Sequence, residues 1–220
     1  MVSYNKILEE RSNSVEEYTA YLNKNLDILK EIGSIGMGHA ATSLSQMLNM
    51  KVAMTMPTVY IKTPSETSEY LNNREETPIG VMVGLQKDAR GCILQILSRK
   101  FAMKIINYFF QGNLEELGDL DEMSFSVIQE IGNITSGAYC NSLASMTGLF
   151  MDITTPTHCK NFDEDLKLKE KAADEPLIII NNKFFIDNEE VNSDFLFMPE
   201  DDTAKRVITK LKEYYGFKEQ

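Results

Sequence analysis

Tryptophan is absent from the 220-residue sequence, and histidine and cysteine are scarce, with two and three residues. The cysteines are odd in number and widely spaced, which argues against a disulfide framework and favours reduced thiols. Neither histidine belongs to a Cys/His cluster with metal-ligand spacing, so we expect no metal site. Long apolar runs are also missing, which excludes a membrane-spanning helix and a signal peptide and favours a cytoplasmic protein.

Positive charge is in short supply as well. The 22 Lys and Arg residues against 33 Asp and Glu give a formal net charge of −11. Nucleic acids and anionic membranes bind basic surfaces, so both are disfavoured as partners. The hydrophobic content of 43% and charged content of 25% are ordinary for a globular protein.

A repeat becomes visible when the sequence is shifted by 99 residues. Residues 26–59 then align without gaps with residues 125–158. The identities include Glu31 with Glu130, Gly33 with Gly132, Gly38 with Gly137, Leu44 with Leu143 and Pro57 with Pro156. The chain therefore contains two copies of one structural unit.

Each copy opens with a helical pattern and continues into strands and a closing helix. We expect strands over 58–62, 79–86, 91–98, 176–186 and 193–199, and closing helices over 99–112 and 201–217. Short turns between the strands favour antiparallel pairing and hence an α+β fold. A further helix is expected near residues 15–23.

The predicted fold is a duplicated helix–strands–helix unit with pseudo-twofold symmetry. We expect a single domain, residues 1–220, made of repeats at about 25–112 and 124–217 that are joined by an acidic connector. In this arrangement the antiparallel sheet is covered by the two long helices that carry the repeated motif.

The glycines of the first copy, Gly33, Gly36 and Gly38, have two interpretations. A phosphate-binding loop needs a Lys followed by Ser or Thr, which neither copy has, and Gly36 is replaced by Thr135 in the second copy. Glycine inside a helix costs about 1 kcal/mol, so its recurrence favours a packing role. We expect Gly33 and Gly132 to lie where the helices meet other elements near the pseudo-twofold axis.

Polar residues form a ridge on each motif helix. At 100° per residue, Ser126, Glu130 and Asn133 fall within about 60° of each other. The corresponding residues of the first copy are Asp27, Glu31 and Ser34. A solvated helix face would explain an arbitrary polar stripe, but here the glutamate recurs and a proline follows each ridge at the same spacing.

This pattern resembles the CheC/CheX/FliY family of chemotaxis phosphatases. The family signature is Asp or Ser, three residues, Glu, two residues, Asn, twenty-two residues and Pro, and the second copy matches it throughout, at Ser126, Glu130, Asn133 and Pro156. The first copy matches at Asp27, Glu31 and Pro57, but Ser34 stands in place of the asparagine. Two motif copies are similar to the CheC layout, whereas CheX carries one intact motif. FliY-like proteins add a flagellar-switch domain, for which no residues follow Gln220.

The resemblance implies a protein phosphatase that hydrolyses the aspartyl phosphate of a CheY-type receiver domain. Asn133 would orient the attacking water, and Glu130 would pair with the receiver's lysine to fix the docking register. Ser126 would be a docking contact, and Pro156 would shape a turn beneath the site. The chain itself would bind no cofactor, because Mg²⁺ is expected on the receiver.

The substitution at Ser34 predicts a weak or inactive first site, since serine lacks the two-ended amide of asparagine. Asp27 and Glu31 would still be able to bind a receiver, beside Pro57.

CheD, a receptor-modifying deamidase, is a second partner implied by the family, and the charged stretch 161–175 is either part of such a surface or a solvated insertion. Two alternatives to the enzyme remain: a non-enzymatic adaptor that binds CheY or CheD, and a flagellar-switch-associated protein.

Overall fold

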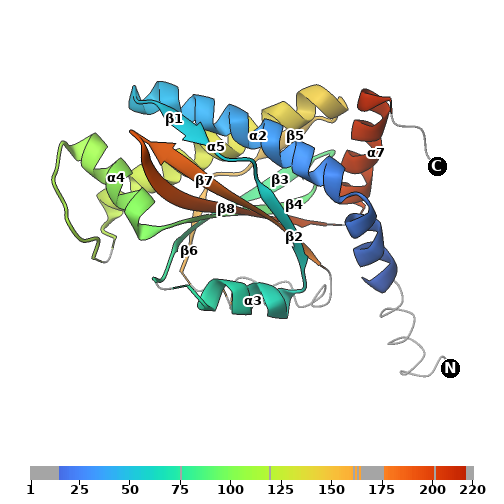
Figure 1. Ribbon diagram of the computed structural model, residues 1–220, viewed down its shortest axis with the longest axis horizontal. Coiled ribbons are helices and arrows are strands. Elements are labelled where there is room, and N and C mark those ends of the chain that lie inside the picture. The colour runs from blue at the N-terminus through green and yellow to red at the C-terminus, as the bar shows by residue number, and fades with distance from the viewer. Residues whose placement is uncertain are drawn as a thin grey trace.

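The computed structural model describes residues 15–74, 76–118, 120–160, 162, 164, 176–200 and 202–216 (Figure 1). A helix at 15–24 is followed by α2 (Leu26–Leu48), β1 (Val52–Met54), β2 (Thr58–Lys62), α3 (Pro64–Asn72), β3 (Ile79–Lys87), β4 (Gly91–Leu97), α4 (Arg99–Phe110), α5 (Glu122–Thr147), β5 (Met151–Ile153), β6 (Thr157–Cys159), β7 (Leu177–Ile186), β8 (Glu189–Pro199) and α7 (Thr203–Tyr215). The predicted α+β class is confirmed.

All strand pairs of the sheet are antiparallel, as predicted. The order is β1–β7–β8–β4–β3–β5, with β2 also on β7 and β6 also on β3. The central pair is β4 with β8, where Leu94 lies opposite Leu196.

The two repeats interlock through this sheet. The short strands β1 and β2 of the first repeat pair with β7 of the second, and β5 and β6 of the second pair with β3 of the first. This reciprocal exchange gives the pseudo-twofold symmetry that the duplication predicts. Each repeat therefore completes the other's part of the sheet.

The motif helices α2 and α5 lie side by side across one face of the sheet, while α3 lies on the opposite face (Figure 1). The strands contribute side chains to the hydrophobic cores on both faces of the sheet. In β7, Ile178 and Ile180 belong to the main core under α2 and α5, and Leu177 and Ile179 belong to a smaller core on the α3 side. This alternation follows the two-residue period of a strand with both faces buried.

The long helix α5 is fixed at both ends by its own sequence. The Asp121 carboxylate accepts a hydrogen bond from the backbone N–H of Ser124 at 2.7 Å, which caps the first turn. Gly148 ends the helix with a φ of 69°, a left-handed conformation that suits glycine. The second motif is thereby carried on a well-defined helix.

The glycines of the motif helices differ in what surrounds them. A Cβ on Gly33 would lie 3.1 Å from Ile180 Cγ2, and one on Gly132 would lie 2.5 Å from Val81 Cγ1, so these two glycines let α2 and α5 approach the sheet. The expectation of a packing role is wrong for Gly38, because a Cβ there would meet no atom within 4 Å. Its recurrence as Gly137 therefore has no steric explanation in the described residues.

Gly36 marks the closest approach between the two motif helices. A Cβ there would lie 2.3 Å from Cδ2 of the Tyr139 ring, which stacks in turn on Phe195. The second copy does not need this space, because Thr135 is buried and donates its hydroxyl to Gln95 Oε1 at 2.8 Å. The two repeats therefore pack this helix position differently: a glycine leaves room for a ring in the first repeat, and a threonine forms a buried hydrogen bond in the second.

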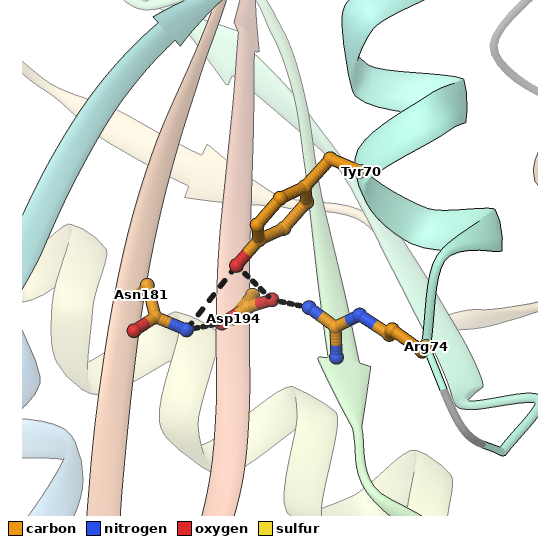
Figure 2. A network of polar contacts seen from close by, with 4 residues as sticks. All are labelled: Tyr70, Arg74, Asn181 and Asp194. Carbon is orange, nitrogen blue, oxygen red and sulfur yellow. Dashed lines mark hydrogen bonds and ion pairs between the residues drawn. The ribbon is translucent and has the colours of Figure 1, made fainter.

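A buried charge anchors the segment after α3 to the sheet (Figure 2). The carboxylate of Asp194, on β8, is fully buried and accepts hydrogen bonds from Arg74, from Asn181 and from the Tyr70 hydroxyl at 3.3 Å. The guanidinium neutralises the carboxylate, and the other two donors satisfy its remaining lone pairs.

Four elements were absent from the expectations: α3 and the short strands β1, β5 and β6. The strand expected over 193–199 also begins earlier, at Glu189. The three short strands have three residues each, too few for a periodic pattern to stand out.

Candidate functional site

The ridge predicted on the second motif helix exists on the surface of α5. Ser126, Glu130 and Asn133 are all exposed. The Ser126 hydroxyl donates to the backbone oxygen of Glu122 at 2.8 Å. A carboxylate and a carboxamide therefore project from a rigid helix toward solvent, where they can reach into a partner.

A pocket of about 360 Å³ lies beside this ridge. Its lining contains all four residues of the second motif, Ser126, Glu130, Asn133 and Pro156. The structure thus brings the proline, 23 positions after the asparagine in sequence, to the same place as the helix ridge. Pro156 itself is buried, in keeping with a structural role beneath the pocket.

Four further residues line the pocket that sequence reasoning did not single out: Gln129, Ile153, Thr154 and Thr155. Gln129 donates its side-chain amide to the backbone oxygen of Pro156 at 2.7 Å, which joins α5 to the loop. Thr154 is held to β3, where its hydroxyl accepts from the N–H of Gly84 at 2.8 Å and its own N–H donates to Gly84 oxygen at 2.9 Å. The loop opposite the ridge is thereby fixed on both sides.

The first site is built differently around Glu31. The Glu31 carboxylate lies close to Tyr215, at the end of α7, and interacts with it electrostatically. The pKa of Tyr215 is raised by partial burial and by the negative charge of Glu31. Part of the first ridge is therefore engaged by the chain's own last described helix.

The other residues of the first site also depart from the second. Asp27 is exposed and lies 3.8 Å from the Lys30 amine, and Lys30 occupies the position that Gln129 holds in the second copy. Ser34 is half-buried, and Pro57 is buried against Gly33. The exposed side chain of Met56 stands where the second loop has Thr155.

Comparison with known proteins agrees with this duplicated geometry. The model of the CheC-like family matches residues 25–61 and again residues 123–159, which are the two motif helices with the strands that follow them. Both repeats of the chain are thus similar to the CheC-like family.

Two curated relatives are similar to part of this chain. The CheY-P phosphatase CheC of Bacillus subtilis is 31% identical over 137 residues, which cover 60% of this chain and 65% of that protein. The CheY-P phosphatase CheX of Thermotoga maritima is 33% identical over 93 residues, 42% of this chain and 54% of that protein. The aligned part is thus less than two thirds of the length of either relative.

The fold of this protein is similar to that of Thermotoga maritima FliY. The superposition with the FliY crystal structure has a TM-score of 0.71 at 23% identity and covers 89% of this chain and 98% of that chain.

Several sequence expectations concern features beyond the motif. Within the described ranges, no group of three or more His, Cys, Asp or Glu side chains is placed to hold a metal ion. None of the helices described is long and apolar enough to cross a bilayer. The three cysteines all lie in the described part of the chain, where they are buried and form no disulfide bond. Apart from residues 162 and 164, the stretch 161–175 lies outside the described residues, so the CheD surface suggested there stays a prediction.

Proposed function

We propose that this CheC-like protein hydrolyses the aspartyl phosphate of a CheY-type receiver domain at its second site. The observation that carries the proposal is the joint placement of Glu130 and Asn133 on an exposed, capped helix beside a pocket formed with Pro156. The relatives named CheY-P phosphatases support the substrate class, among them a putative CheY-P phosphatase CheC1 of Halobacterium salinarum at 23% identity.

The ridge suits a reaction in which the partner supplies most of the chemistry. An aspartyl phosphate is labile, so the main remaining task is to hold a water in line with the phosphorus. The water oxygen forms the new P–O bond as the bond to the aspartate oxygen breaks. The aspartate leaves as a carboxylate, and the water's protons pass to the released phosphate and to solvent.

In this reaction Asn133 orients the water. Its carbonyl oxygen accepts a hydrogen bond from the water, while its NH₂ donates to a phosphoryl oxygen, and the amide keeps the same charge throughout. Glu130 lies one turn earlier and pairs with a lysine of the receiver, which fixes the register of docking. Mg²⁺ belongs to the receiver in this proposal, and the chain supplies positioning alone.

The first site favours a binding role. Serine at position 34 cannot accept from water and donate to phosphate at the reach of an asparagine, and the Tyr215 hydroxyl engages Glu31. A non-enzymatic role for this half, binding CheY or CheD, is the second candidate function.

The test is phosphate release from a phosphorylated CheY-type receiver in the presence of Mg²⁺. Wild type should accelerate release, and Asn133→Ala should lose about 100-fold of kcat, the effect of removing one positioned donor. Asn141→Ala, which removes another exposed amide from α5, is the matched control and should match wild type. Binding without acceleration by wild type would overturn the enzyme in favour of the adaptor.

A further inference from the structure

A second hollow lies next to the proposed site, between the end of α4 and the first turn of α5. It has a volume of about 370 Å³. Phe110, Leu114 and Met123 form its apolar walls over Ile106, and Asp121 lies at its rim. We refer to it as the α4–α5 groove.

The walls of the α4–α5 groove are unusually exposed for apolar side chains. Phe110, Leu114 and Met123 are 43%, 45% and 65% exposed. Half of the ten strongly exposed large apolar side chains in the described part of the chain lie between residues 108 and 123. Such a cluster marks a surface that gains free energy when a partner covers it.

The groove is formed before any partner binds. The side-chain amide of Asn107 donates to the backbone oxygen of Leu114 at 3.0 Å, and its carbonyl oxygen accepts from the Leu114 N–H at 2.8 Å. Outside the groove, the stacked rings of Phe125 and His158, with centroids 4.2 Å apart, hold the start of α5 against β6. A preformed groove requires little ordering on binding.

The groove continues the catalytic ridge. Met123 precedes Glu130 by seven residues, so it lies about 10 Å away along the helix axis and within about 20° around it. A specific protein interface buries about 800 Å² on each partner, far more than the small pocket at Asn133 offers. A protein docked on Asn133 must therefore extend its contact along α5, and the groove lies in that path.

The charges around the groove restrict the chemistry of the partner surface. Asp121 lies at the rim of the groove, and Glu115, Glu116 and Glu122, which are close in sequence to the groove residues, are exposed. No Lys or Arg is among the described residues that line it. An apolar side chain flanked by Lys or Arg would complement both the walls and the rim.

The first copy has no corresponding apolar contact on its ridge. Met123 aligns with Lys24, an exposed residue at the end of the helix 15–24. The groove therefore distinguishes the second site from the first.

We propose that the α4–α5 groove is the docking subsite for the same receiver domain, and that it binds an apolar side chain flanked by basic residues beside the receiver's phosphorylation site. This inference rests on the proposed function, because it takes Asn133 as the point at which the receiver docks.

The test separates binding from chemistry by comparing variants of the full chain. Met123→Ala and Leu114→Ala should each raise the Kd for the receiver, and the KM for its phosphorylated form, about tenfold with kcat within about twofold of wild type. Asn133→Ala should show the opposite pattern, with kcat lost and Kd retained. Phe150→Ala removes a comparably exposed aromatic residue that follows the other end of α5 and should leave all three quantities unchanged.

Each other outcome has a defined meaning. If Met123→Ala and Leu114→Ala bind the receiver like wild type while Asn133→Ala is inactive, the docking proposal is overturned and the phosphatase stands. If wild type neither binds nor dephosphorylates a receiver, both proposals are overturned. A concentration-dependent dimer that Met123→Lys abolishes would assign the groove to a second copy of this chain instead, and would also overturn the docking proposal.

Discussion

Gln129 binds the backbone oxygen of Pro156 through its side-chain amide, at 2.7 Å. This hydrogen bond connects the helix that presents Asn133 to the loop that closes the pocket. The equivalent position of the first copy is Lys30, whose amine lies 3.8 Å from Asp27 instead. The connection is therefore a feature of the second site.

Gln129→Ala should lower kcat without removing any group that touches the phosphate. The loop would lose one of its two attachments, and a small displacement of reacting groups reduces the rate by about tenfold or more. Stability should fall by about 1 kcal/mol, the net contribution of one hydrogen bond. Steady-state phosphate release and urea unfolding measure the two effects. An unchanged kcat together with an intact fold would show that the connection does not position the site.

The two glycines Gly36 and Gly38 should respond to alanine in opposite directions. Gly36→Ala forces a Cβ into the Tyr139 ring and should destabilise the protein by about 1–3 kcal/mol. Gly38→Ala meets no atom within 4 Å and should stabilise it by about 1 kcal/mol through helix propensity. Both glycines lie inside α2, so each variant serves as the control for the other when unfolding is measured by chemical denaturation. Equal shifts for the two variants would contradict the close contact between α2 and α5.

Several features of the fold could be predicted from the sequence because they are local or repeated. The strand β2 was expected at its observed residues, since Val59, Tyr60 and Ile61 favour extended structure. The ridge on α5 followed from helical spacing alone. The helix α3 was missed although Thr63 and Glu66 form a capping box, because its interior is mostly polar.

Other features depend on contacts between distant segments and leave no local signal. The exchange of short strands between the repeats could not be read from either repeat alone. The same holds for the bond between Gln129 and Pro156 and for the approach of Tyr215 to Glu31, which joins the first ridge to the last described helix. The sequence predicted which motif residues would form the second site. It did not predict the hydrogen bonds that fix the loop of that site.

Arg74→Ala should be strongly destabilising, because it leaves the fully buried Asp194 carboxylate without its cation. Loss of one partner from a buried ion pair costs about 3–5 kcal/mol. Adding Asp194→Asn should recover much of this loss, since it removes the unpaired charge. Lys210→Ala is the control, because its pair with Glu213 is exposed on both sides and contributes less than about 1 kcal/mol. Similar losses for Arg74→Ala and Lys210→Ala would contradict a buried pair. Denaturant unfolding measures all four proteins.

The buried thiol of Cys140 should make the folded protein less stable at alkaline pH. Burial raises the pKa of its thiol to about 12, whereas the unperturbed value is 9.0. Because the pKa of the thiol is higher in the folded state, its contribution to stability is fully present below the unfolded pKa. This contribution is lost as the pH rises from about 9 toward 12. Over this range the free energy of unfolding falls by up to about 1.4 kcal/mol per pH unit because of this one group.

Cys140→Ala removes the thiol and is the comparison for that slope. The variant should be less stable than wild type at pH 8 because it leaves a small cavity, and the difference should shrink as the pH rises above 9. Unfolding free energies at a series of pH values measure this. A constant difference up to pH 11 would show that the thiol does not ionise more easily on unfolding.

Restoring an asparagine at position 34 should not by itself make the first site active. In the Asn133→Ala background, where the second site is silent, Ser34→Asn supplies the amide but leaves the Tyr215 hydroxyl beside the Glu31 carboxylate. Phosphate release should therefore stay near background. Adding Tyr215→Phe frees the carboxylate to pair with the receiver's lysine, and release should rise by about tenfold or more. Tyr214→Phe, at the neighbouring and more exposed tyrosine, is the matched control and should add nothing. Full activity from Ser34→Asn alone would show that the contact with Tyr215 opens freely, and that the missing amide is all that separates the first site from the second.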